Sequence, residues 1–595
     1  MTHAYANLGA SPRDGGVRFL VWAPAARALE LVIEPGGARH AMTPAGDGYH
    51  ETFVTGLGAG TRYRYSMDGG DPLPDPASRF QPEGVHGPSL VVDPSTYRWN
   101  HDDWQGVPQQ ALVIYELHTG TFSPEGTFAG VRERLPLLKN LGVSAIELMP
   151  VADFPGRWNW GYDPAALFAP SRAYGSPDDL RALIDEAHGL GLAVFLDVVY
   201  NHLGPDGAYL LAFSPQFFTD KHKTPWGAAI NLDGEGAHGV RNFLLQNALH
   251  WLREYRFDGL RLDATFALID DSPKHFLVEL AEAAARLEGP KRYLIAEDPR
   301  NLKELVLPRD EGGYGLDGVW ADDFHHQVRR ILAGDKDSYY GDFSDSTVDL
   351  ATTLRQGWFY AGQVSSHEGV PRGTDPSGLA PDKFVIAIQN HDQVGNRPYG
   401  NRLSDDIALN AYRAASALLL FAPQLPLLFM GQEWATTAPF RYFTDHHKEL
   451  GKLVSEGRKE EFKDFAGFTG EVPDPQDPET FRLSKLDWAE REEGAHAKML
   501  TFYQHLLARR RELSGVFSAE SPVEGGLLLS RGRHILYVAL KEGVSLPLPA
   551  GLTPVWHSEE ARYTDRPQPP QVLDTEVFFP KEAALLIEAP QPSLR

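Results

Sequence analysis

The chain is 595 residues long, carries a formal net charge of −24, and contains 42% hydrophobic residues and no cysteine. Its length predicts several domains, at roughly 100–200 residues each. The acidic charge argues against nucleic acid or an anionic membrane as a partner, and the lack of cysteine excludes disulfides and thiol chemistry. No run of about 20 apolar residues could cross a membrane, and residues 1–7 lack the segments of a secretory signal. We therefore expect a cytoplasmic protein.

Residues 1–95 are predicted to form a β-sandwich. A sandwich of this size often accompanies carbohydrate-active enzymes, but it is equally a generic packing module. In Arg62–Met67 the side chains alternate, which places Tyr63 and Tyr65 on one face of a strand. A proline-rich stretch, 71–89, is the expected connection to the next domain.

Residues 96–515 alternate between strand and helix patterns, which indicates a (β/α)8 TIM barrel. The clearest helix is Pro177–His188, with Ser176 as its N-cap and Asp179 completing a capping box. A doubly wound open sheet is the alternative, because a sequence does not prove that the sheet closes. Residues 203–240 are predicted to be a loop domain inserted after the third strand. The candidate strands are Leu112–Glu116, Ala145–Met149, Ala193–Val198, Gly259–Asp263, Tyr293–Glu297, Gly318–Trp320, Phe384–Gln389 and Pro426–Phe429.

Strand patterns return after the last barrel helix, so residues 516–595 are predicted to form a second β-sandwich. The segments with strand character there are Gly526–Ser530, His534–Leu540 and Thr575–Phe579. The predicted fold class is α/β, a TIM barrel flanked by N-terminal and C-terminal β-sandwich domains.

The fourth candidate strand carries two charges inside an apolar segment, Phe257–Phe266. Side chains alternate along a strand, so Arg261 and Asp263 share one face while Leu260 and Leu262 share the other. If the leucines pack outward against helices, the charges lie in an interior or a cleft, where they must be paired or perform chemistry. Taken alone, a structural ion pair and a catalytic site are equally good interpretations.

Further charged residues lie near the ends of the other candidate strands, at the rim where TIM barrels keep their active sites. Paired carboxylates suit glycoside hydrolysis, which needs neither metal nor cofactor. A divalent metal site is the competing interpretation, but Arg261 within the cluster would repel a cation. The charged residues at the rim are Glu116, His118, Asp197, His202, Asp263, Glu297, Asp322, Asp323, His391 and Asp392.

Four segments in order along the chain resemble the four motifs of the α-amylase superfamily, and Tyr162-Asp163-Pro164 resembles its segment after the second strand. The four segments are Asp197–His202, Gly259–Asp263, Ile295–Asp298 and Gln389–Gln393. They fall on the third, fourth, fifth and seventh candidate strands, and four ordered matches are highly specific. The resemblance implies a TIM barrel with the chemistry of a retaining glycosidase.

The resemblance also implies a role for each carboxylate. Asp263 would be the nucleophile, Glu297 the general acid/base, and Asp392 the residue that holds hydroxyls of the distorted sugar. Arg261 would keep Asp263 ionised, with support from Asp197. For a retaining enzyme, we expect the carboxyl groups of Asp263 and Glu297 to lie about 5–5.5 Å apart.

Sugar contacts around the cleavage point are implied in the same way. His202 and His391 would hydrogen-bond the sugar, and Tyr162 would stack beneath it. Calcium-binding members of the superfamily have an asparagine where Asn201 stands, but this residue alone is weak evidence. We expect neither a metal nor a cofactor.

Segments outside the four motifs resemble the maltooligosyltrehalose trehalohydrolase family. These are Pro74–Ser89, Trp320–His326 with Tyr339-Tyr340 following, Pro439–His446, and Glu456–Phe462. The resemblance implies cleavage of the α-1,4 bond next to a terminal α,α-trehalose of maltooligosyltrehalose, which releases trehalose. It also implies a functional partner, maltooligosyltrehalose synthase, that makes the substrate.

The trehalose unit would be recognised at the end of the sixth candidate strand, where sugar hydroxyls could meet charged partners. The candidate contacts are Asp322, Asp323, His325 and His326, and bonds within the barrel are the alternative role for each. Two other functions remain open. One is a glycogen-branching transferase, which uses the same intermediate. The other is a non-catalytic glucan-binding protein, against which the intact catalytic carboxylates argue.

Overall fold

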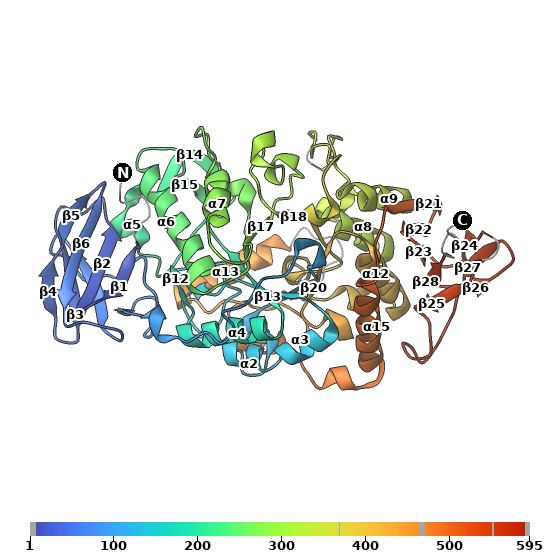
Figure 1. The fold of residues 1–595 in the computed structure, drawn as a ribbon, viewed down its shortest axis with the longest axis horizontal. Helices are drawn as coiled ribbons and strands as arrows, with labels where there is room; N and C mark the ends of the chain where they lie inside the picture. The colour runs from blue at the N-terminus through green and yellow to red at the C-terminus, as the bar shows by residue number, and fades with distance from the viewer. Residues whose placement is uncertain (1–6, 368, 463–470, 550–551, 590–595) are drawn as a thin grey trace.

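The structure is a computed structural model that describes residues 7–367, 369–462, 471–549 and 552–589. Residues 1–6, on which the expectation of no secretory signal depends, lie outside the described residues, as does part of the predicted C-terminal sandwich. The N-terminal strands lie at one end of an elongated molecule, the barrel lies in the middle, and the C-terminal strands lie at the other end (Figure 1).

The N-terminal part consists of two four-stranded antiparallel sheets that face each other. Tyr63 and Tyr65 of β7 are fully buried, as the alternation predicts, and Tyr63 meets Phe19 of the other sheet at 4.9 Å between ring centres. The strands of the first sheet are β1 (Gly9–Arg13), β2 (Gly16–Trp22), β6 (Tyr49–Thr55) and β5 (Thr43–Gly46). Those of the second are β4 (Ala38–Ala41), β3 (Leu29–Glu34), β7 (Arg62–Met67) and β8 (Ser89–Leu90).

The central part is a closed barrel of eight parallel strands, which rules out the open sheet. Its interior is filled by apolar side chains such as Phe195, Ile295 and Leu427. Leu260 and Leu262 instead pack in the core outside the barrel with the surrounding helices, as expected. The strands in barrel order are β9 (Ile114–Leu117), β10 (Ala145–Leu148), β13 (Ala193–Val198), β16 (Gly259–Leu262), β17 (Tyr293–Ala296), β18 (Gly318–Trp320), β19 (Phe384–Ala387) and β20 (Leu425–Phe429).

Helices surround the barrel. The capping box between Ser176 and Asp179 is present at the start of α4, as predicted, and α4 ends at Gly189. The longer helices are α3 (Leu135–Leu141), α4 (Pro177–Gly189), α6 (Ala237–Leu249), α7 (Phe276–Ala285), α8 (Asp323–Leu332), α9 (Thr347–Gln356), α12 (Leu409–Phe421), α13 (Lys448–Glu461) and α15 (Gly494–Arg510). The shorter ones are α1 (Thr119–Phe122), α2 (Phe128–Arg132), α5 (Leu210–Phe213), α10 (His391–Gly395), α11 (Leu403–Asp406) and α14 (Pro478–Leu483). None of the helices that the structure describes is both long and apolar enough to cross a membrane.

Two small hairpins sit on the connections that follow barrel strands. One pairs β11 (Ala152–Asp153) with β12 (Ala166–Pro170), after β10. The other pairs β14 (Phe218–Thr224) with β15 (Gly227–Ile230), in the long connection between β13 and α6. The second hairpin falls in the segment where the sequence predicts an inserted unit.

The C-terminal part contains a five-stranded and a three-stranded antiparallel sheet around a shared core. An ion pair of 2.6 Å between Arg413 of α12 and buried Glu559 ties it to the barrel. The larger sheet contains β21 (Phe517–Val523), β22 (Gly526–Arg531), β23 (His534–Ala539), β28 (Ala583–Glu588) and β25 (Pro554–His557). The smaller contains β24 (Val544–Pro547), β27 (Glu576–Phe579) and β26 (Gln571–Val572).

Candidate active site

A cleft of about 750 Å³ opens at the carboxyl ends of the barrel strands. Asp263 directly follows β16 and Glu297 directly follows β17, while Asp392 lies on α10, in the connection after β19. All three line the cleft. The barrel thus brings together the three carboxyl groups that the sequence predicts as catalytic.

The Arg261 guanidinium lies beneath these carboxyl groups and is fully buried. Its Nη1 donates to Asp263 Oδ1 at 2.7 Å and to Asp197 Oδ2 at 3.0 Å. Its Nη2 lies 3.8 Å from Glu297 Oε2 and 4.0 Å from Asp392 Oδ2. One buried cation therefore lies within 4.0 Å of four acidic groups, and its charge offsets part of their mutual repulsion.

Glu297 has the environment of a proton donor. Burial raises its pKa to about 8; Arg261 opposes the rise, and the charges of Asp263 and Asp392 add to it. The carboxyl group therefore holds its proton at neutral pH. The backbone amide of Ala264 donates to Glu297 Oε2 at 2.6 Å, from a left-handed backbone conformation (φ 43°) that residues with a side chain rarely adopt. This unusual turn after Asp263 holds the Glu297 carboxyl in place.

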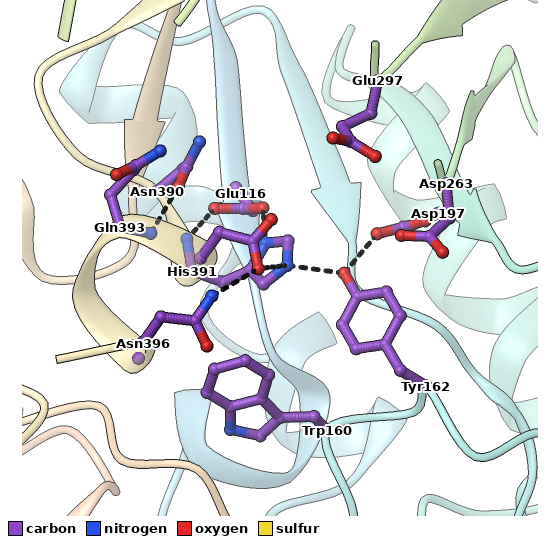
Figure 2. A network of polar contacts seen from close by, with 12 residues as sticks. Glu116, Trp160, Tyr162, Asp197, Asp263, Glu297, Asn390, His391, Gln393 and Asn396 are labelled. Carbon is purple, nitrogen blue, oxygen red and sulfur yellow. Dashed lines mark hydrogen bonds and ion pairs between the residues drawn. The ribbon is translucent and has the colours of Figure 1, made fainter. Parts of the chain in front are cut away.

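A chain of hydrogen bonds crosses the floor of the cleft (Figure 2). The Tyr162 hydroxyl points between two partners, donating to Asp197 Oδ2 at 2.6 Å and meeting His391 Nε2 at 2.7 Å. Glu116 accepts from the backbone amide of His391 at 2.8 Å and contacts its Nδ1 at 2.5 Å. Burial lowers the pKa of His391, but Glu116 and Asp392 outweigh burial and raise it to about 9. His391 is therefore a cation near neutral pH.

One wall of the cleft is aromatic. Trp226, at the turn between β14 and β15, is 48% exposed and stacks on His202 with ring centres 5.0 Å apart and an interplanar angle of 7°. Phe266 lies 6.2 Å from the Trp226 ring, and His202 Nε2 bonds the Tyr162 carbonyl oxygen at 2.7 Å. Flat exposed rings of this kind suit stacking on sugars. The sequence points to His202 but not to Trp226 or Phe266, because aromatic richness in a connection does not say which ring is exposed.

Another wall is formed by α13. Arg458 and Glu461 line the cleft with Tyr442. Arg458 donates to Glu461 Oε2 at 2.8 Å and to the carbonyl oxygen of Gly395 at 2.7 Å, which joins α13 to the end of α10. The sequence marks the segment 456–462 by resemblance alone and assigns no role within it.

Three of the four residues expected to contact trehalose are bonded or packed within the protein. The Asp323 carboxylate accepts hydrogen bonds from the amides of Phe359 and Tyr360 at 2.7 and 3.0 Å. His325 bonds the carbonyl oxygen of Ile388 at 2.9 Å through Nδ1. His326 is buried and packs against aromatic rings, including that of Tyr339, 4.9 Å away. None of the four, Asp322 included, is among the residues that line the cleft.

Asp322 has a different environment. It is partly buried, and burial, with Asp392 and Asp323 adding to the effect, raises its pKa to about 7. Its charge is also one of those that raise the pKa of Glu297. Of the four expected trehalose contacts, Asp322 is therefore the one that acts electrostatically on the catalytic carboxyl groups.

One group of side chains has the composition of a cation site. His222, Asp233 and Asp271 bring their ligand atoms within 4.8 Å of one another. The Lys221 ammonium lies 2.8 Å from Asp233 Oδ2 and 3.2 Å from Asp271 Oδ2, so a protein cation already pairs with both carboxylates. Asn201, buried elsewhere, is not part of this group.

The barrel and the carboxyl groups around Arg261 define a glycosidase of the α-amylase family. Residues 78–217 match the model of the α-amylase catalytic domain, and residues 7–94 match carbohydrate-binding module 48, the isoamylase N-terminal domain. The malto-oligosyltrehalose trehalohydrolase of Deinococcus radiodurans is 50% identical over 512 residues, which cover 85% of this chain and 83% of that protein. The chain belongs to the malto-oligosyltrehalose trehalohydrolase family.

Two further comparisons agree with this placement. A solved structure from Salmonella typhimurium, provisionally described as an alpha amylase, superimposes with a TM-score of 0.89 at 38% identity and covers 98% of this chain and 99% of its own. The 1,4-alpha-glucan branching enzyme GlgB of Corynebacterium jeikeium is 28% identical over 525 residues, covering 80% of this chain and 67% of that enzyme. Because this identity is well below the 50% shared with the trehalohydrolase, the branching alternative is not favoured.

Proposed function

We propose that the protein hydrolyses the α-1,4-glucosidic bond next to the terminal α,α-trehalose of maltooligosyltrehalose, with retention of configuration, and so releases trehalose and a maltooligosaccharide. One observation carries the mechanism. Asp263 and Glu297 contact the same guanidinium, yet only Asp263 is bonded to it at 2.7 Å, whereas Glu297 has a pKa raised to about 8. Two carboxyl groups in such different environments suit a nucleophile and an acid.

In the first step, the Asp263 carboxylate attacks the anomeric carbon of the sugar on the non-reducing side of the bond. Glu297 gives its proton to the glycosidic oxygen as the bond breaks, so trehalose leaves as a neutral alcohol. A covalent glycosyl ester on Asp263 remains. Arg261 and the ionised carboxylates keep the site charge balanced while positive charge develops on the sugar ring.

In the second step, the Glu297 carboxylate takes a proton from a water molecule, which attacks the same anomeric carbon. The ester bond to Asp263 breaks, the carboxylate is restored, and Glu297 is again protonated. Two displacements at one carbon give net retention. The hydrolase and a branching transferase differ at this step alone, because a transferase admits a sugar hydroxyl in place of water.

The carboxylate of Asp392 holds hydroxyls of the sugar at the cleavage point, and His202 adds a further polar contact. The ring nitrogens of His391 contact Glu116 and Tyr162, so His391 meets a sugar hydroxyl only if one of these contacts is exchanged. Tyr162, fixed by Asp197 and His391 at 2.6 and 2.7 Å, supports the sugar ring from below. Charge-assisted hydrogen bonds allow this subsite to bind a distorted sugar.

The position of the acid supports one direction for the substrate. The leaving group must lie beside Glu297, so trehalose occupies the wall formed by Phe266 and Trp226. The glucan chain then extends toward Trp160 and the wall formed by α13. Asp322 is the remaining candidate for a trehalose contact among the four expected residues; Asp323, His325 and His326 act by holding the surrounding segments in place.

The nucleophile can be tested by trapping. Incubating the Glu297→Gln variant with an α-glucosyl fluoride, whose leaving group needs no acid, should accumulate a glucosyl ester. Peptide mass spectrometry should find the added hexose on the peptide that contains Asp263. Labelling of another carboxylate, with Asp263 unmodified, would contradict the assignment.

The trehalose subsite is tested by comparing substrates. Asp322→Asn should lose more activity on maltooligosyltrehalose than on a maltooligosaccharide of equal length. Glu461→Gln is the matched control, because it removes one negative charge from the wall formed by α13 instead. Equal losses on both substrates would remove the trehalose-specific role. A maltooligosyltrehalose synthase is the enzyme we propose to supply the substrate, in a cytoplasmic route of trehalose biosynthesis.

A further inference from the structure

A second groove, of about 450 Å³, lies at the amino-terminal end of the barrel, away from the catalytic cleft. It is bordered by the residues that enter β16 and β17, including Arg256 and Arg292. Four arginines line it, although the chain has a net charge of −24. The residues that concern the argument are Arg253, Arg256, Arg286, Arg292, Trp104 and His188.

Two of these arginines have no acidic partner. Among the residues that the structure describes, no carboxylate forms an ion pair with Arg253 or Arg292. Arg292 donates instead to the carbonyl oxygens of Leu252 at 3.3 Å and Pro290 at 3.0 Å. Arg253 is exposed, and its side chain reaches the amide oxygen of Asn7 at 3.4 Å. Burial lowers the pKa of Arg292, against an opposing contribution from the Asp258 charge, because a partly buried cation loses hydration.

The other two arginines are only partly neutralised. Arg256 pairs with Asp102 at 2.7 Å. Arg286 contacts Glu282 at 3.1 Å, but the same carboxylate also serves Lys274 at 2.7 Å. Arg309 is a third cation near Glu282, at 3.6 Å. The Glu282 carboxylate is thus shared among three cations. Two acids line the groove itself, Asp102 and Glu288, and of these two only Asp102 forms an ion pair with one of the four arginines among the described residues.

The buried acid nearest the groove, Asp258, is held by hydrogen bonds within the protein, although its charge also acts on Arg292. Asp258 accepts from Trp104 Nε1 at 2.7 Å and from the amide of Val194 at 2.8 Å, and it bonds His188 Nε2 at 2.9 Å. Its hydrogen-bonding capacity is therefore used within the protein. These bonds also hold the Trp104 and His188 rings stacked, with centres 4.7 Å apart and an interplanar angle of 10°. The stacked pair forms a rigid wall beside the arginines.

We propose that this groove binds a small phosphorylated organic ligand, with the phosphate on Arg253 and Arg292 and the organic part against the Trp104–His188 wall. Guanidinium groups match the geometry of phosphate oxygens and form charge-assisted hydrogen bonds with them. A half-buried ring offers a flat apolar face to a sugar or a base. The site is separate from the catalytic cleft and needs none of its residues.

Calorimetric titration of the full-length protein at low ionic strength tests this site. The probes are glucose 6-phosphate, ADP and inorganic phosphate. Saturable binding of at least one of the two esters is expected, tighter than that of inorganic phosphate, and it should weaken as salt is added because the exposed charges are screened. Arg253→Gln and Arg292→Gln should each weaken ester binding by at least about tenfold.

Arg13→Gln provides the matched control, since it removes one exposed positive charge from the N-terminal sheet and should leave ester binding unchanged. If Arg292→Gln does not fold, Arg253→Gln decides alone, because Arg253 is exposed. The proposal is overturned if neither ester binds at millimolar concentration, or if binding survives both groove variants. Equal losses in Arg13→Gln, or equal affinity for inorganic phosphate and the esters, would also contradict it.

Discussion

Arg261 Nη1 donates to Asp263 Oδ1 at 2.7 Å from a fully buried position at the centre of the barrel. The same nitrogen bonds Asp197, so removal of the guanidinium would leave two carboxylates without their cation. Breaking a buried ion pair by removing one partner typically costs about 3–5 kcal/mol. Arg261→Gln should therefore lower kcat by at least about 100-fold. Arg261→Lys keeps the charge but loses the forked geometry of the guanidinium, so its kcat should lie between those of the wild type and Arg261→Gln. Steady-state kinetics would check this, with circular dichroism as the control for folding. Near wild-type kcat in Arg261→Gln would contradict the role.

The pKa of Glu297, raised to about 8, predicts the alkaline side of the activity profile. The first step needs protonated Glu297, so kcat/KM should fall as pH rises through about 8. The same shift affects stability. An unfolded carboxyl group ionises near pH 4.5, so the contribution of Glu297 is fully present below that pH and is lost as pH rises through about 8.

The variant Glu297→Gln separates these two effects. It cannot ionise, so its stability should decline less than that of the wild type between the two pKa values, which parallel denaturant unfolding curves would measure. Its activity should be lower by roughly 10²–10⁴-fold on substrates with poor leaving groups. A wild-type profile that stays flat well above pH 8 would be inconsistent with Glu297 as the acid.

Tyr162 links two charged groups through one hydroxyl. Its hydrogen bonds to Asp197 and His391 are 2.6 and 2.7 Å long, and the Tyr162 and His391 rings stack with centres 5.3 Å apart. Tyr162→Phe keeps the ring but removes both bonds. Because a hydrogen bond to a charged group contributes about 1.5–3 kcal/mol, kcat/KM should fall by roughly 10–150-fold. Tyr442→Phe, farther along the cleft, is the matched control and should lose much less.

Chelation should leave the activity unchanged. The carboxylates of Asp233 and Asp271 already share the Lys221 ammonium at 2.8 and 3.2 Å, which is the charge a divalent ion would otherwise supply. Activity measured after dialysis against EDTA should therefore equal that of untreated enzyme. Loss of activity with EDTA and its return with calcium would show that a metal is required.

The sequence predicts the barrel well because its signals are local. Eight apolar segments and the capping box of Pro177–Gly189 need only neighbouring residues to be recognised. It also predicts the three carboxyl groups at the rim, since each directly follows a strand or lies in the connection after one. Strand ends are less certain: the first strand begins at Ile114, not at the predicted Leu112.

Contacts between distant segments are what the sequence does not provide. Asp323 is expected to meet substrate, yet its carboxylate is bonded by the amides of Phe359 and Tyr360, 36 and 37 residues further along the chain. Arg458 reaches the cleft because α13 packs against Gly395, 63 residues earlier. No local pattern encodes either pairing. Only the folded structure shows that the Asp323 carboxylate is already hydrogen-bonded and that α13 forms a wall of the cleft.

The central claim is that this chain cleaves maltooligosyltrehalose to free trehalose through a covalent ester on Asp263. Proton NMR followed during the first turnovers on maltotriosyltrehalose tests it most directly. The account predicts that free trehalose and the α-anomer of maltotriose appear together, before mutarotation forms the β-anomer. Initial formation of β-maltotriose would show inversion and remove Asp263 as the nucleophile, and new α-1,6 linkages in place of free maltotriose would show a transferase.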